Sequence, residues 1–115
     1  MTGYGLARKL VGDGKILSSS FGNYFNPATG LVYLVTETAI GNDGASLLSA
    51  AHECEHLRQW ERFPWLFDFR WFTPVNLWLE WRANRAALRV IEPYLYPEEM
   101  RRCQRLVWRR LFTYL

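Results

Sequence analysis

Proline placement constrains this chain more than any other feature, because proline fixes the backbone and cannot continue a helix or a central strand. The 115 residues include five prolines, and each stands at a break in the hydrophobic pattern. Pro27 lies in Asn-Pro-Ala-Thr-Gly at 26–30, a strong turn signal between β-prone stretches at 16–24 and 31–36. These two stretches predict a β-hairpin.

The other four prolines divide the second half of the chain into helices. Pro64 and Pro93 end helical segments, while Thr73-Pro74 and Pro97 have the character of helix starts. The Gly-Asn-Asp-Gly cluster at 41–44 supplies an N-cap for the first long helix, and Thr73 is the expected N-cap of the second. We therefore expect helices at about 4–11, 45–62, 73–91 and 97–115.

These elements predict an α+β fold. A small antiparallel β-hairpin or sheet would pack on the helices at 45–62, 73–91 and 97–115, and an aromatic-rich connector at 63–73 would join the first two. Half of the residues are hydrophobic and 17% are aromatic, so the chain can bury a core without disulfides or metals as staples. The length allows one domain, spanning 1–115.

Composition excludes several classes of protein. The formal net charge is +3, and eight acidic residues accompany eleven arginines after position 50, which favours salt-bridged helix faces over a nucleic-acid interface. No run is long enough to span a bilayer, and the N-terminus lacks the apolar segment of a signal peptide, so we expect a cytoplasmic location. Cys54 and Cys103 are expected to be reduced and buried.

The segment His52-Glu53-Cys54-Glu55-His56 carries the clearest chemistry. Histidines at i and i+4 of a helix are one turn plus about 40° apart, so both imidazoles reach one point in space. That arrangement suits a tetrahedral Zn²⁺ site with an open position. Glu53 would lie beside the water bound to such a metal and would deprotonate it.

The other faces of this helix also have a pattern. At about 100° per residue, Ala50, Cys54 and Leu57 form an apolar stripe opposite His52. A third face contains Glu55, Arg58 and Arg62, as expected for solvent exposure and for i,i+3 or i,i+4 pairing.

The third ligand should be a carboxylate, because no other histidine exists. Glu61 lies on the same helix and cannot turn inward, and Asp68 in the connector stays a candidate. Glu80 is better placed, on the inward face of its helix beside Ala83 and Ala87, where a neighbouring helix could approach. The alternative is that Glu80 is a buried carboxylate paired with an arginine.

One turn after Glu80, Asn84 is placed to hydrogen-bond a ligand histidine. His52-Glu53-x-x-His56 followed by Glu80-x-x-x-Asn84 resembles the gluzincin clan of zinc metallopeptidases. Their third ligand is a glutamate on a following "glutamate helix", often with an aspartate four residues later, where this chain has Asn84. At this length the chain is most similar to minigluzincins, single-domain peptidases with a small sheet, an active-site helix and a glutamate helix.

The resemblance covers the order of elements over roughly 16–92, and only the motif residues are specific. It implies one Zn²⁺ per chain, a peptide or protein substrate, and Glu53 as general base and then proton donor to the leaving amine. It also implies that the strand at 31–36 lines the cleft. Gluzincins add a histidine or tyrosine that stabilises the oxyanion; Tyr24, Tyr33 or an arginine could substitute here.

Two other functions stay open. The chain could be a catalytically silent binding or structural protein with a zincin fold, for instance a phage or assembly component, or a metal-free, arginine-rich helical adaptor. In the last helix, Met100, Cys103, Val107 and Leu111 form an apolar stripe, which favours packing as an ordinary third helix. That helix could instead cover the cleft or dock a partner, and it or the aromatic segment 63–81 could mediate self-association or contact a membrane surface.

Overall fold

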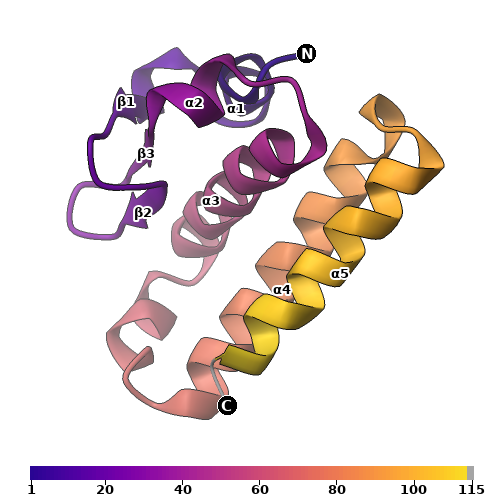
Figure 1. Cartoon of the computed structure of the whole chain (residues 1–115). Coiled ribbons are helices and arrows are strands. Elements are labelled where there is room, and N and C mark those ends of the chain that lie inside the picture. The colour runs from indigo at the N-terminus through magenta and orange to yellow at the C-terminus, as the bar shows by residue number, and fades with distance from the viewer. Residues whose placement is uncertain (114–115) are drawn as a thin grey trace.

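A computed structural model of the chain describes residues 1–113. The fold is α+β, as predicted: a small sheet with two short helices lies on one side of the long central helix α3 (Gly44–Arg62), and two long helices lie on its other side (Figure 1). Those two helices are α4 (Thr73–Ile91) and α5 (Pro97–Thr113), which run side by side in opposite directions. Thus α3 is the element that both halves share.

The sheet has three strands in the order β1-β3-β2. Strands β2 (Tyr24–Asn26) and β3 (Leu31–Leu34) form the predicted antiparallel hairpin, with Phe25 opposite Val32. The turn between them ends at Gly30, whose φ of 69° and close contact with the Trp60 ring both suit glycine.

The predicted single strand at 16–24 was wrong. Only β1 (Ile16–Ser18) and the first residue of β2 belong to it, and β1 pairs with β3 in parallel, so the sheet is mixed. Short polar side chains divide the stretch: Ser19 Oγ accepts from the Phe21 backbone N–H, and Asn23 bonds the Val35 N–H and the Thr38 hydroxyl. These bonds stabilise a loop in place of a continuous strand.

Helix α1 (Gly3–Val11) is confirmed, and Thr2 caps it by accepting from the Gly5 N–H. The predicted strand at 31–36 ends at Leu34, because Thr36–Ile40 form the short helix α2. Gly3 lets α1 and α2 touch, since a Cβ there would lie 2.0 Å from the Thr38 carbonyl oxygen. A short 3₁₀ turn, η1 (Asp13–Lys15), leads from α1 into β1.

The long helices begin and end within one residue of their predicted positions over the described range, and the predicted end of the last helix at 114–115 lies outside it. The connector after α3 is the 3₁₀ segment η2 (Pro64–Phe69), and η3 (Glu92–Tyr94) joins α4 to α5. Thr73 is not the N-cap of α4; that position is Phe72, and Thr73 begins the helix.

Two apolar clusters meet on α3. One joins the sheet to α3 through Phe25, Val32, Cys54 and Leu57 and extends to Leu79 of α4. The second lies between α3, α4 and α5 and contains Leu47, Leu48, Ala87, Ile91, Cys103 and Val107. Because α3 contributes to both, its rotation about its own axis is fixed, and with it the direction of every side chain on its remaining face.

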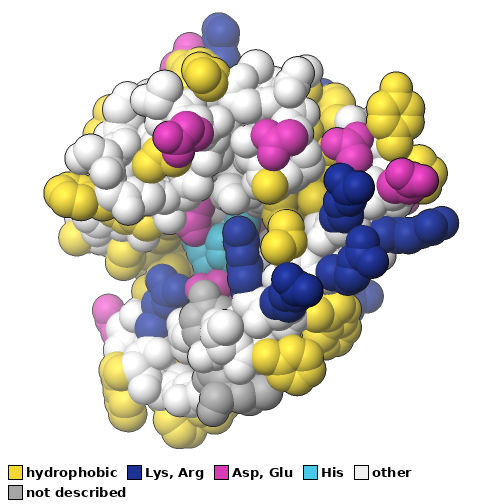
Figure 2. Space-filling model, in the orientation of Figure 1, with side chains coloured by type: hydrophobic (Ala, Val, Ile, Leu, Met, Phe, Trp, Pro, Cys, Tyr) yellow, Lys and Arg dark blue, Asp and Glu magenta, His cyan; other side chains and the backbone are white. Residues whose placement is uncertain are grey.

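Helix α5 packs as the predicted third helix, with Cys103 and Val107 buried and Arg101, Arg105 and Arg109 exposed. No helix within residues 1–113 is long and apolar enough to cross a membrane. The connector exposes several aromatic side chains, and aromatics of α4 and α5 are exposed as well; Figure 2 shows apolar and basic side chains gathered over this half of the molecule.

Candidate metal centre

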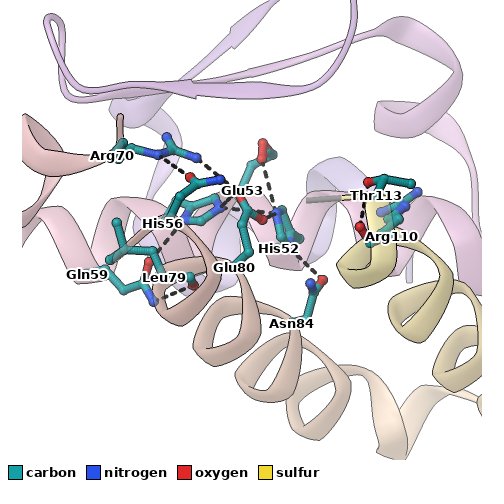
Figure 3. A network of polar contacts seen from close by, with 11 residues as sticks. His52, Glu53, His56, Gln59, Arg70, Leu79, Glu80, Asn84, Arg110 and Thr113 are labelled. Atoms are coloured by element: carbon teal, nitrogen blue, oxygen red, sulfur yellow. Dashed lines mark hydrogen bonds and ion pairs between the residues drawn. The ribbon is translucent and has the colours of Figure 1, made fainter. Parts of the chain in front are cut away.

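Helices α3 and α4 bring His52, His56 and Glu80 together (Figure 3). One ligand atom from each lies within 4.8 Å of the others, which is the arrangement that the sequence predicted. Ala83, which is fully buried one turn after Glu80, lets the two helices approach closely. These three residues could hold a metal ion.

The two histidines are held in the form that binds metals. Nδ1 of His52 lies 2.7 Å from Oδ1 of Asn84, and Nδ1 of His56 lies 2.9 Å from Oε1 of Gln59. An amide oxygen only accepts, so each Nδ1 carries the proton and donates it, which leaves a lone pair on each Nε2. The predicted role of Asn84 is therefore present in the geometry.

Gln59 was missed by the sequence analysis. Its amide nitrogen donates to the Leu79 carbonyl oxygen at 3.0 Å, so it ties α3 to α4 while its oxygen orients His56. The available signal was its spacing: Gln59 follows His56 by three residues, and side chains at i and i+3 of a helix are neighbours.

The acceptor atoms of the cluster converge. The two Nε2 atoms are 3.1 Å apart, and Oε2 and Oε1 of Glu80 lie 3.0 and 3.2 Å from the Nε2 atoms of His52 and His56. Oε2 of Glu80 is buried and receives no hydrogen bond from the residues that the structure describes. Converging lone pairs around a buried carboxylate are costly unless a cation or a proton lies between them, and this donor set, two imidazoles and a carboxylate, fits a metal ion.

Glu80 is also paired with an arginine, as the alternative interpretation expected. Nη2 of Arg70 donates to Oε1 of Glu80 at 2.8 Å, and Nε of Arg70 donates to Oδ1 of Asn76 at 3.2 Å. The guanidinium also lies over the Phe67 ring. Oε1 of Glu80 therefore contacts both Arg70 and His56, while Oε2 faces His52. No spacing rule pointed to Arg70, because it lies in the irregular segment after η2.

Glu53 projects into the same site. Its Oε1 is 3.8 Å from Nε2 of His52, and its Oε2 is buried without a hydrogen-bond partner within the described part of the chain. Burial raises the pKa of Glu53 above its ordinary value, although the nearby histidines and Arg70 oppose that shift. A carboxylate with a raised pKa and a free oxygen is suited to accepting and returning a proton.

His52 and Glu80 of the cluster shift each other's pKa. Burial lowers the pKa of His52, but the contact with Glu80 and the charges of Glu53 and Glu80 outweigh it, and the pKa is raised. Burial would raise the pKa of Glu80, but its contacts with both histidines hold it well below its usual range. Each group thus favours the charged form of the other.

Several other predicted positions lie outside the site. Asp68 is exposed and Glu61 pairs with Lys15 at 3.0 Å, so neither joins the cluster. Cys54 and Cys103 are both buried and reduced, as expected, and burial raises the pKa of Cys54 to about 12. Cys54 is on the apolar stripe opposite the histidines, so it is not a ligand.

The prediction that Glu55 is solvated was wrong. Its side chain is buried, and burial raises its pKa. The expected i,i+3 pairing is confirmed, because Glu55 pairs with Arg58 at 3.1 Å. Arg58 and Arg62, the other members of that face, are exposed as expected. The reason is that α3 lies between the sheet on one side and helices α4 and α5 on the other (Figure 1). Less of its surface therefore meets solvent than in a helix that packs on one side only.

A cleft of about 340 Å³ opens onto the cluster. The expectation that the strand at 31–36 lines it was wrong, because β3 is the central strand and the edge strand β2 lies at the cleft instead. Tyr24 is a lining residue and Tyr33 is not. Apart from the cluster, the cleft is lined by Asn23, Tyr24, Phe25, Ser49, Glu53, Arg70, Asn84 and Arg110.

Comparison of the sequence with models of known protein families gives no match, and comparison with curated proteins and with solved structures gives none either. The metal-binding capacity of His52, His56 and Glu80 therefore rests on the geometry of these residues in this chain.

Proposed function

We propose that this chain is a zinc-dependent metallopeptidase of gluzincin type. The observation that carries the proposal is the convergence of His52, His56 and Glu80 beside Glu53, a buried carboxylate with one oxygen that no described residue hydrogen-bonds. Two imidazoles and one carboxylate are the ligand set of thermolysin-like zinc hydrolases, which leave a position open for water. Zinc bound there would polarise the substrate carbonyl and acidify a water molecule.

The residues around the cluster supply the rest of the chemistry. Glu53 accepts the proton of the attacking water and delivers it to the leaving amine, a role that its raised pKa favours. Asn84 and Gln59 hold the two imidazoles in one tautomer, and Arg70 holds Glu80 through one oxygen only. Tyr24 and Arg70 line the cleft and are the candidates for stabilising negative charge on the carbonyl oxygen.

The decisive test is Glu53→Gln. The substitution keeps the shape of the side chain but removes the base, so hydrolysis of a peptide library should fall at least about a thousandfold, within the range seen when proton transfer is lost. One zinc per chain should still bind, as measured by metal analysis of protein purified without chelator. If Glu53→Gln cleaves as fast as the wild type, the proposed mechanism is wrong.

A catalytically silent binding or assembly protein is the second candidate, and the exposed aromatic residues favour it. Trp65, Trp71 and Phe72 are 58%, 77% and 51% exposed, next to the cleft residue Arg70. Aromatic side chains gathered at a surface are typical of interaction sites, including self-association. This candidate gains support if zinc-loaded protein cleaves nothing in the library and sediments as a dimer that Trp71→Ser dissociates.

A further inference from the structure

Two arginines line the cleft, one on each side of the cluster. Figure 3 shows Arg70 on the His56 side and Arg110 on the side of His52 and Asn84. Arg70 is engaged by Glu80 and Asn76. The side chain of Arg110, in contrast, forms no hydrogen bond or ion pair with any residue of the described range 1–113.

The helix pattern explains why Arg110, although exposed, lines the cleft while the adjacent Arg109 does not. Val107 is buried against α3 and α4, and Arg110 follows it by three residues, so both lie on one face of α5. Arg109 is rotated by about 100° from Arg110 and belongs to the exposed stripe with Arg101 and Arg105. Arg109 and Arg110 are thus adjacent, both exposed, and of the two only Arg110 lines this cleft.

The charges of the cleft are unbalanced once a divalent ion is bound. With neutral histidines, the two arginines offset Glu53 and Glu80, so the lining has no net formal charge, and a divalent cation adds two positive charges. The remaining lining residues are uncharged. Such a cleft attracts a negatively charged ligand, and the guanidinium of Arg110 matches a carboxylate in shape.

We propose that Arg110 binds a carboxylate of the substrate, so that the site prefers peptides with an acidic side chain or a free C-terminus close to the cleaved bond. The inference rests on the proposed function in that the ligand is a peptide held at the metal centre. Arg110 acts as a specificity residue: it selects the substrate and takes no part in proton transfer.

Binding is the cleanest test. Zinc-loaded Glu53→Gln protein, which does not consume the peptide, is titrated with peptides that differ only by Glu against Gln, or by a C-terminal carboxylate against an amide. Tryptophan emission or calorimetry gives Kd. We expect the peptide with the carboxylate to bind about fivefold more tightly, the size of a solvent-accessible ion pair. The two peptide pairs separate a side-chain carboxylate from a terminal one.

Variants of the two adjacent arginines show which side chain causes the preference for a carboxylate. Adding Arg110→Gln should remove it, Arg110→Lys should keep part of it, and Arg109→Gln should leave it unchanged. Equal binding of acidic and neutral peptides would overturn the inference, as would a preference that Arg110→Gln retains, because the metal itself would then hold the carboxylate. Cleavage without a carboxylate preference contradicts only this inference, whereas a preference without any cleavage by wild type contradicts only the proposed hydrolysis.

Discussion

The two faces of α3 are buried to a similar degree and differ in what burial does. On one face Ala50, Cys54 and Leu57 are completely buried among apolar neighbours. On the other, Glu53 and His56 are 8% and 2% exposed, yet Oε2 of Glu53 has no hydrogen-bond partner among residues 1–113. Apolar burial stabilises the fold, whereas unpartnered polar atoms cost stability. One face of the helix therefore stabilises the fold, and the other is arranged for a ligand.

Removing side-chain volume from the apolar face should have the largest effect on stability. Leu57→Ala leaves a cavity between α3 and the sheet, and we expect a loss of about 2–5 kcal/mol in the free energy of unfolding. Denaturant unfolding measures it. Metal affinity of the folded variant should stay close to that of the wild type. A loss below about 1 kcal/mol would mean that this cluster is loosely packed.

Metal binding at the polar face should change the free energy of unfolding by somewhat less than Leu57→Ala does. A ligand that binds only the folded state stabilises it by about 2.7 kcal/mol at a hundred times its Kd. Zn²⁺ should therefore raise the unfolding temperature of the wild type, and chelation should reverse the shift. Glu80→Gln, which removes the charged ligand, should largely abolish it. An unfolding temperature that zinc leaves unchanged would contradict the assignment of this face.

Residues that orient the metal ligands, such as Asn84, should have a smaller effect again, and we expect it in metal affinity. Asn84→Ala leaves Nδ1 of His52 without its acceptor, and loss of such a partner lowers metal affinity about 10- to 100-fold. Asn84→Asp is the matched control, because a carboxylate also accepts from Nδ1 and should preserve affinity. Competition with a chromogenic chelator measures both. If Asn84→Ala binds zinc as tightly as Asn84→Asp, the orienting role of Asn84 is disproved.

Sequence periodicity predicted the parts of the molecule that local chemistry determines. Helix bounds followed from proline and glycine, and the apolar stripe of α3 followed from spacing at about 100° per residue. The same spacing placed His52 and His56 on one face. Glu80 and Asn84 were predicted because a helix has only one inward side, and few residues on that side of α4 are polar.

The parts that sequence did not predict depend on contacts between distant segments. The parallel pairing of β1 with β3 occurs together with loop hydrogen bonds of Asn23, which hydrophobic alternation does not reveal. Arg70 reaches Glu80 from the irregular segment after η2, which has no periodicity, and Arg110 reaches the cleft because α5 packs back onto α3 and α4. The burial of Glu55 likewise depends on which elements flank α3.

The smallest predicted effect concerns pH, and its sign separates the metal-free protein from the metal-bound one. The pKa of His52 is raised in the folded protein, so its contribution to stability is complete below the unfolded value of about 6.5 and is lost as pH rises through the folded value. The raised pKa of Glu53 acts in the same direction. The lowered pKa of Glu80 contributes stability that is lost only in acid, so this contribution is constant between pH 6 and pH 8.

Stability of the metal-free protein should therefore fall slightly from pH 6 to pH 8, as measured by urea unfolding in the presence of chelator. Zinc affinity should rise over the same range, because ligand histidines must lose protons to bind a metal. His52→Asn should flatten the fall, while Leu57→Ala, on the apolar face, should keep it. A metal-free protein that gains stability from pH 6 to pH 8 would show that Glu80 does not hold the proton on His52, and the difference between the two faces of α3 would then not extend to protonation.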